Sequence, residues 1–199
     1  MTPTAAERGR ETRGQLLDAA AQLVGEEGWG GVTTRKVAER AGVRPGLVHY
    51  HFASVDNLLI DACLAYVERE LSGMNQLLAN TPDRGTGLAA LLEVMASYSS
   101  DNPGTTIFSE MLLAATRHQR LRDELARMLR ELRHTVADWL ARHGDPGEAE
   151  ATSAVLLAVI DGLILHQLID PNLHSLPLVV PLRRLAGLPT ETGTEPPGQ

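Results

Sequence analysis

Residues 44–51 bring together the side-chain types that proteins use to bind nucleic acid. Helical spacing places Val48 and Phe52, four residues apart, on one buried face of a short helix. The remaining face carries a cation, an aliphatic side chain and several rings, namely Arg44, Leu47, His49, Tyr50 and His51. Such a face can hydrogen-bond base edges and phosphates and can touch a thymine methyl group. The pattern predicts a helix that reads a major groove.

The neighbouring residues predict how this helix is positioned. Thr33 is suited to cap a preceding helix, and Gly42 can take the left-handed backbone that ends it. Pro45 fits the first turn of the reading helix, where its missing N–H costs no hydrogen bond. An upstream helix that ends at Gly28 adds core side chains, which are Leu16, Leu17, Ala20, Leu23 and Val24. Residues 33–52 are therefore expected to form a helix-turn-helix inside a three-helix domain.

In the order and spacing of these elements, residues 10 to 60 resemble the DNA-binding domain of the TetR family of bacterial transcriptional regulators. The resemblance rests on the threonine-capped helix, the Ala-Gly-Val turn, the His-Tyr-His-Phe end of the reading helix, and Leu58-Leu59 in a fourth helix. Pattern and resemblance together predict DNA contacts from Thr33, Thr34, Arg35, Lys36, Arg44, Pro45, Gly46, Leu47, His49, Tyr50 and His51.

Different contacts are expected from these side chains. Arg35 and Arg44 are the candidates for base edges, and Leu47 is placed to touch a thymine methyl group. His49 is placed for either a base or a phosphate. The candidates for phosphate contacts are Thr33, Thr34, Lys36 and Tyr50. Packing is the alternative role for Tyr50 and His51.

Two positions depart from the family pattern. Lys36 stands where many members carry an acid that completes a capping box, and a phosphate partner would explain a cation there. The alternative is a solvated lysine. Val55 stands where members often carry a lysine, so one expected phosphate contact is missing.

The net charge of −7 is distributed unevenly. Residues 1–60 contain seven Arg or Lys and seven Asp or Glu, so the other 11 basic and 18 acidic residues carry the whole net charge. Within residues 33–51, four cations face one acid, which gives a local charge of +3. The acidic balance therefore does not argue against DNA binding by the N-terminal domain.

The rest of the chain reads as helix, with glycine and proline at the breaks. Helices are expected near 54–79, 85–100, 104–116, 118–143, 147–170 and 176–187, which makes an all-α protein of about nine helices. The expected layout is a flexible arm over 1–9, the DNA-binding domain over 10–53, a ligand-binding and dimerisation domain over 54–187, and a disordered tail over 188–199.

Residues 154–169 are apolar almost all round, so the helix they form must be covered on several sides. A membrane span is disfavoured because the stretch is short and contains Asp161, His166 and Gln167. Small side chains along it allow a second helix to approach, which predicts a homodimer. The expected interface residues are Ala151, Ala154, Ala158, Gly162 and Leu165. A dimer can place two reading helices on a palindromic operator in double-stranded DNA.

A regulator of this kind also needs a signal to which it responds, such as the binding of a small effector. Apolar and aromatic side chains of the central helices, with a few polar groups, predict an effector pocket. The candidates are Tyr66, Met95, Tyr98, Phe108, Met111, Leu112, Trp139, Asp161 and His166. A small, largely apolar effector that releases a repressor from DNA is the expected mechanism.

Two other interpretations of the protein's function remain open at this point. Glu131 and His134 have the spacing of carboxylate-bridged metal bundles, but a second such motif is missing, so a metalloenzyme is disfavoured. No catalytic, metal or cofactor residues are expected. A DNA-associated structural protein without sequence preference is the other alternative. Cys63 is expected to be a buried structural thiol, and the polar first 14 residues favour a cytoplasmic, nucleoid-associated protein.

Overall fold

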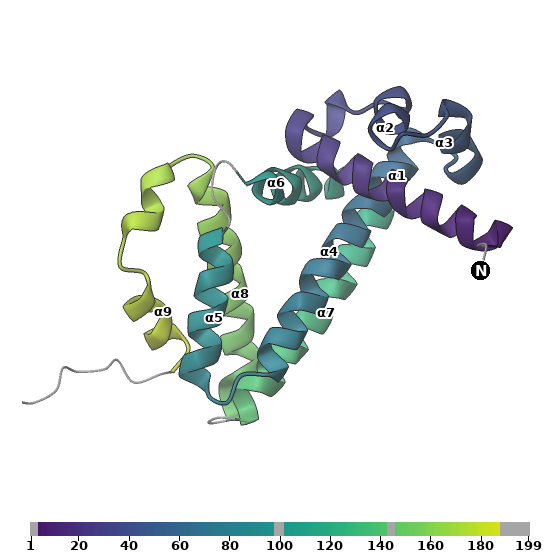
Figure 1. The fold of residues 1–199 in the computed structure, drawn as a ribbon. Helices are drawn as coiled ribbons and strands as arrows, with labels where there is room; N and C mark the ends of the chain where they lie inside the picture. The colour runs from purple at the N-terminus through teal and green to yellow at the C-terminus, as the bar shows by residue number, and fades with distance from the viewer. Residues whose placement is uncertain (1–3, 98–101, 143–145, 188–199) are drawn as a thin grey trace, which may run out of the picture. The chain divides into compact units, whose positions relative to one another are not determined.

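The computed structural model describes residues 4–97, 102–142 and 146–187, and the regular elements of these residues are all helices (Figure 1). The α-helices are α1 (Ala5–Glu27), α2 (Thr34–Arg40), α3 (Pro45–His51), α4 (Val55–Ala79), α5 (Arg84–Ser97), α6 (Pro103–Ala115), α7 (Gln119–Arg142), α8 (Ala149–Gln167) and α9 (Val179–Leu185). Three short 3-10 helices are η1 (Trp29–Gly31), η2 (Pro146–Glu148) and η3 (Pro171–Ser175). The expected all-α class is confirmed.

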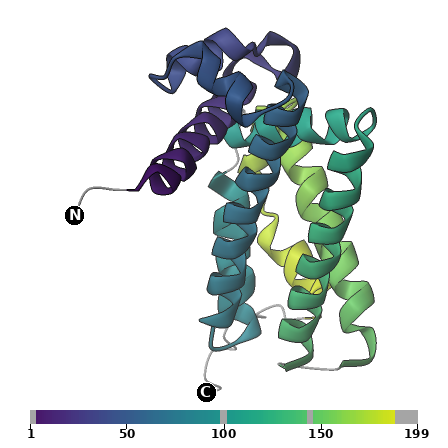
Figure 2. The same cartoon turned by 90° about the vertical axis from the view of Figure 1, so that its right-hand side faces the viewer.

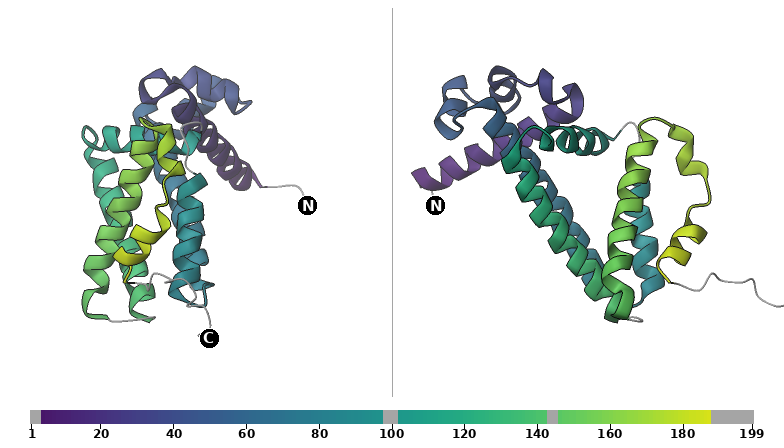
Figure 3. Two further views of the ribbon diagram at one scale, coloured as in Figure 1. Left: turned by 90° about the vertical axis from the view of Figure 1, so that its left-hand side faces the viewer. Right: turned by 180° about the vertical axis from the view of Figure 1, so that it is seen from behind.

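The helices divide into two units. Of the described residues, 4–73 and 102–131 form the first unit, and 74–97, 132–142 and 146–187 form the second. Within the first unit, α6 lies against α1 and η1, and α2 packs on α1 and α3 (Figure 2). Within the second, α9 lies against α5 and α8 (Figure 3). The two long helices α4 and α7 contribute residues to both units.

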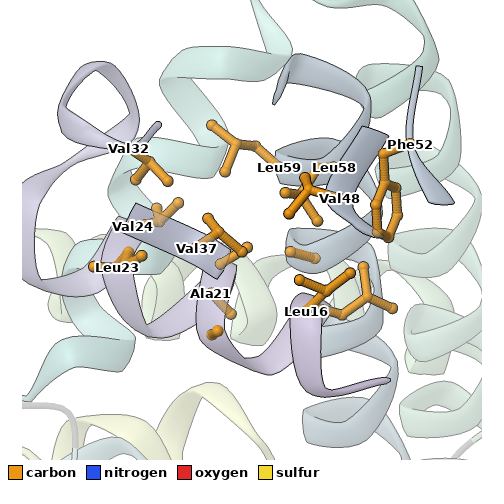
Figure 4. Close-up of a cluster of buried hydrophobic side chains, with 14 of the residues drawn as sticks. Leu16, Ala21, Leu23, Val24, Val32, Val37, Val48, Phe52, Leu58 and Leu59 are labelled. Atoms are coloured by element: carbon orange, nitrogen blue, oxygen red, sulfur yellow. The ribbon is translucent and has the colours of Figure 1, made fainter. Parts of the chain in front are cut away.

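The core of the first unit is built from the apolar positions that helical spacing places inward. Leu16 and Val24 of α1 face Val37 of α2 and Val48 of α3, and all four are almost completely buried (Figure 4). Leu58 and Leu59 at the start of α4 close the same cluster. Because side chains from four helices share this core, it holds α3 in a defined orientation.

The N-terminal arm expected over residues 1–9 is helical from Ala5 onward, which corrects that expectation. Thr4 Oγ1 accepts the Glu7 N–H at 3.2 Å, and the Glu7 carboxylate accepts the Thr4 N–H at 2.6 Å. This reciprocal capping box satisfies two backbone donors and starts α1 four residues into the chain.

Near the C-terminal end of the described residues, a proline explains why the observed helix is shorter than the expected one. The helix expected over 176–187 is observed only over Val179–Leu185. Leu176 has φ −73° and ψ 144°, the extended backbone that a residue before proline favours, and Pro177 follows it. The tail expected over 188–199 lies outside the described residues, as does the end of the helix expected over 85–100.

Helix α8 buries one face and leaves another exposed. The buried face consists of Ala149, Ser153, Leu156, Ile164 and Gln167, which repeat at helical spacing. Ala151, Val155 and Ala158 lie on the other side of the helix and are exposed. By length and composition, α8 is the one described helix apolar enough to cross a membrane, and less than a quarter of its apolar stretch is buried. A buried or interface helix in a soluble protein has the same composition, so this finding is weak support for a membrane span.

Candidate DNA interface and effector domain

The turn between α2 and α3 has the geometry that its residues predict. Thr33 Oγ1 accepts the Lys36 N–H at 3.3 Å and so caps α2. Gly42 has φ +67°, a left-handed conformation that a side chain would strain. Immediately after it, the Val43 N–H donates to Ala38 O at 2.9 Å, which closes the end of α2. Pro45 then occupies the first turn of α3.

Helix α3 presents most of its predicted reading face to solvent. Val48 and Phe52 are buried, whereas Tyr50 is 80% exposed and Arg44, Leu47 and His49 are also exposed. His51 is half-buried, with its ring 5.1 Å from Tyr50 and 6.3 Å from Phe52 between centroids. Its position between these two rings suits the packing alternative as well as a DNA contact.

Two of the four cations in the motif are held by acids at the end of α1. Lys36 Nζ pairs with Glu27 Oε2 and also donates to Gly31 O at 2.9 Å. Arg40 makes a bidentate pair with Glu26, at 2.9 and 2.6 Å. The Arg40 guanidinium lowers the pKa of Glu26, and Glu26 raises the pKa of Arg40, in each case through their hydrogen bonds. Glu27 thus explains Lys36 without a phosphate partner.

The cations at the two predicted base-reading positions, unlike Lys36 and Arg40, are not held by acids of α1. Arg35 and Arg44 are exposed, and neither forms an ion pair with another described residue. Glu26 and Glu27 neutralise Arg40 and Lys36, so they reduce the local charge from +3 to +1. The positive charge that remains available to DNA is on Arg35 and Arg44. Sequence reasoning did not identify Glu26 and Glu27 as partners, although their position before Gly28 places them near the start of α2.

Helix α6 contacts α1 and the short turn that connects α1 to α2. The Trp29 N–H donates to Glu110 Oε2 at 2.8 Å, and the Trp29 ring lies 5.4 Å from the His118 ring. Gly25 approaches Pro103 so closely that an added Cβ would lie 3.0 Å from it. These contacts join α1 and η1 to α6 and to the residue just before α7, and no local sequence pattern predicts them.

Two family models match this chain, one in its N-terminal part and one in its C-terminal part. The model for "Tetracyclin repressor-like, C-terminal domain" matches residues 82–188, and the model for "Bacterial regulatory proteins, tetR family" matches residues 16–62. The chain belongs to the TetR family. The family consists of regulatory proteins rather than enzymes, and the helix-turn-helix of α2 and α3 lies inside the N-terminal match.

This TetR-family chain is similar in sequence to known regulators, and it shares its fold with solved structures over most of its length. BetI, an HTH-type transcriptional regulator from Brucella melitensis, is 33% identical over 125 residues, which cover 59% of this chain and 58% of BetI. A transcriptional regulator from Streptomyces coelicolor A3(2) superposes with a TM-score of 0.69 at 27% identity, covering 88% of this chain and 98% of that one. The multidrug-binding protein EbrR, solved with proflavin, gives a TM-score of 0.60 at 29% identity, with coverage of 87% and 99%.

Several predicted effector residues of this TetR-family chain lie in the core of the first unit. Met111 is buried in a cluster with Cys63 and Leu64, and Phe108 packs against that cluster. Tyr66 packs on the neighbouring core, and Leu112 is half-buried. Burial, with a smaller contribution from Glu110, raises the pKa of the Cys63 thiol to about 12. The thiolate is therefore scarce at neutral pH, as expected for a structural cysteine.

Other predicted effector residues belong to the second unit. Trp139 is completely buried, and its indole N–H donates to Thr81 Oγ1 at 3.1 Å. Asp161 is half-buried on α8, and His166 is exposed. Tyr98 and the side chain of Met95 lie outside the described residues. A shallow hollow of about 660 Å³ in this unit has a different lining, which is Asn75, Leu78, Ala79, Thr135, Asp138, Ala141 and Arg142. The predicted effector lining stays a prediction.

The described residues contain no group of three His, Cys, Asp or Glu side chains that could hold a metal ion. The Glu131 carboxylate of the possible metal motif instead accepts from Arg127 at 2.8 Å. Arg127 also donates to Glu124 at 3.0 Å, so the three side chains form a surface ion-pair ladder along α7.

Asp161→Asn is expected to stabilise the protein at pH 7.5 by about 1 to 2 kcal/mol. Burial raises the pKa of Asp161 from 3.8 to about 6, so the folded state favours the protonated carboxyl. Stability from this group is therefore highest below its ordinary pKa and falls as pH rises toward 6. Urea denaturation at pH 7.5 and 4.5 measures the effect, and the two proteins should converge at the lower pH. A less stable variant at pH 7.5 would show that the charged carboxylate has a cationic partner.

Proposed function

We propose that this TetR-family chain is a dimeric, sequence-specific DNA-binding repressor that a small effector releases from a palindromic operator. The observation that carries the proposal is the exposed face of α3 on a shared four-helix core, together with the exposed cations Arg35 and Arg44. As a DNA-binding regulator it would act in the cytoplasm, on the nucleoid.

The proposed contacts follow from exposure and charge. Arg44 at the start of α3 and Arg35 in the first turn of α2 are available for base edges, because no described acid holds them. Tyr50, Thr33 and Thr34 would contact phosphates. Gly46 has open space around it, so the backbone of α3 can approach the DNA closely. The remaining proposed contacts are Lys36, Pro45, Leu47, His49 and His51.

Arg44→Ala should weaken binding to the preferred duplex by about 10- to 100-fold and change binding to random duplex much less. Arg40→Ala is the matched control, because it removes the same charge from a side chain that Glu26 already holds. Its expected effect on the preferred duplex is less than about threefold. Fluorescence anisotropy with both duplexes provides the measurement. Equal losses on the two duplexes for Arg44→Ala would remove its role as a base reader.

The dimer is proposed through α8. Ala151, Ala154, Ala158, Gly162 and Leu165 share the face of α8 opposite its buried residues, and each is exposed or only half-buried in one chain. Gly162 has no neighbouring atom within 4 Å of an added Cβ. An apolar face with small side chains allows a second copy of α8 to pack closely. Two copies would then place two α3 helices on successive major-groove faces.

The effector is proposed to be small and largely apolar. EbrR, a multidrug-binding protein with the same fold, was solved in complex with proflavin, so a protein of this fold can hold a small molecule. In this chain the proposed effector residues are the apolar and aromatic side chains of the central helices, with Asp161 and His166 as polar groups. Effector and operator must oppose each other reciprocally if the effector releases the repressor. Operator affinity that stays constant at saturating candidate ligand would exclude that ligand.

A further inference from the structure

One carboxylate in the first unit joins three helices. Asp61 of α4 accepts from Arg13 of α1 through Oδ2, at 2.5 Å, and from Arg120 of α7 through Oδ1. The Asp61 side chain is only 17% exposed, whereas both arginines are about half exposed. Each oxygen of this partly buried carboxylate therefore holds one guanidinium, and the pairs are charge-assisted hydrogen bonds.

Arg13 also reaches the end of the proposed reading helix. Its guanidinium carbon lies 5.2 Å from the centroid of the Phe52 ring, within the range of a cation–π contact. Phe52 is buried at the C-terminal end of α3, at the edge of the core (Figure 4). A continuous set of contacts thus runs from α3 through Phe52, Arg13 and Asp61 to Arg120.

These contacts connect α3 to the two helices whose remaining residues belong to the second unit, which carries the proposed dimer face. We propose that Asp61 is a positioning residue for DNA recognition, which fixes the orientation of α3 relative to α4 and α7 and so selects the spacing between operator half-sites. This inference rests on the proposed function as a dimeric DNA-binding regulator. Without Asp61, two guanidinium groups would share one site with no acid between them, and their repulsion would loosen α1 and α3.

A second ion pair between the same two helices offers a matched control. Asp18 of α1 pairs with Arg69 of α4 at 2.9 Å, and both side chains are more than half exposed. This pair also links α1 to α4. Unlike Asp61, Asp18 pairs with one arginine only among the described residues, and that arginine belongs to α4 and not to α7. Asp18→Asn therefore breaks an α1–α4 ion pair and leaves the Arg13 and Arg120 contacts of Asp61 in place.

The test uses the full-length protein and a series of duplexes in which the selected half-sites are separated by spacers that differ by one base pair. The wild type and Asp18→Asn should prefer one spacer sharply. For Asp61→Asn, the affinity ratio between the best spacer and its neighbours should fall by about tenfold, because loosened α3 helices accept several spacings. Affinity for a duplex with a single half-site should change by less than about threefold. Asp61→Glu, which keeps the charge, should restore part of the ratio.

The outcomes separate the possible failures. An unchanged spacer ratio in Asp61→Asn, with only a lower melting temperature, would overturn the positioning role and leave a structural one. An equal loss of the ratio in Asp18→Asn would also overturn it, because any weakened α1–α4 contact would then suffice. A wild-type protein that binds no duplex, or shows no spacer preference, would instead contradict the proposed function itself. Arg120→Gln, which keeps the Arg13 pair, gives a second variant should Asp61→Asn fail to fold, and it should lower the ratio in the same direction.

Discussion

Gly87→Ala should lower the free energy of unfolding by about 3 kcal/mol, the upper range for overpacking a core. A Cβ at Gly87 would lie 2.2 Å from Cζ2 of Trp139, in a ring that is completely buried. The indole also donates to Thr81 Oγ1, so it cannot shift without weakening that hydrogen bond. Helix α5 can pack against α7 at this point only because residue 87 has no side chain.

The control for this substitution is Gly73→Ala in α4. An added Cβ at Gly73 meets no atom within 4 Å, so this change should stabilise the helix by about 0.5 to 1 kcal/mol. Urea denaturation followed by circular dichroism measures both variants. A Gly87→Ala protein as stable as the wild type would show that Trp139 does not pack on α5 as described.

Ala158→Glu should convert the dimer into monomers and weaken operator binding by at least about 100-fold. Ala158 is exposed in one chain and lies on the apolar face of α8 that is proposed to pair with a second copy. In a two-fold interface each copy would bring one buried glutamate, and desolvation together with like-charge repulsion would separate them. Because the side chain points away from its own core, each monomer should still fold.

Ala89→Glu provides the matched control, because it places the same charge on an exposed alanine of α5 in the same unit. Sedimentation velocity at several protein concentrations measures the dimer, and anisotropy with the selected duplex measures binding. The Ala89→Glu protein should behave as the wild type in both. A dimeric Ala158→Glu protein would move the interface away from this face of α8.

Local signals in the sequence were sufficient for the helix-turn-helix. The threonine cap, the left-handed glycine and the first-turn proline act within a few residues of themselves, so Thr33, Gly42 and Pro45 could each be placed before the structure was known. Helical spacing likewise identified Val48 and Phe52 as buried. These effects depend on backbone geometry and the burial of one face, and tertiary contacts do not override them here.

Contacts between distant segments could not be placed in the same way. Asp61 accepts hydrogen bonds from two arginines that are 48 and 59 residues away in sequence, and no periodicity relates the three positions. The sequence predicts a phosphate contact for Lys36 because a cation stands where a capping-box acid is usual, whereas in the structure Glu27 of another helix holds it. Ion-pair partners depend on how helices pack, and they are known only when the packing is known. The effector residues pose the same problem, since their identity does not determine which of them face a common space.

Selection from a random duplex pool, at near-physiological salt and with the purified protein, tests whether this chain is a dimeric, sequence-specific DNA-binding regulator. We expect enrichment of a palindrome whose half-sites are about one helical turn apart, because two α3 helices related by a two-fold axis read successive major-groove faces. Sequencing of the retained duplexes gives both the half-site and its spacing. Retention without enrichment of any sequence would contradict sequence-specific recognition and would favour a non-specific DNA-associated protein.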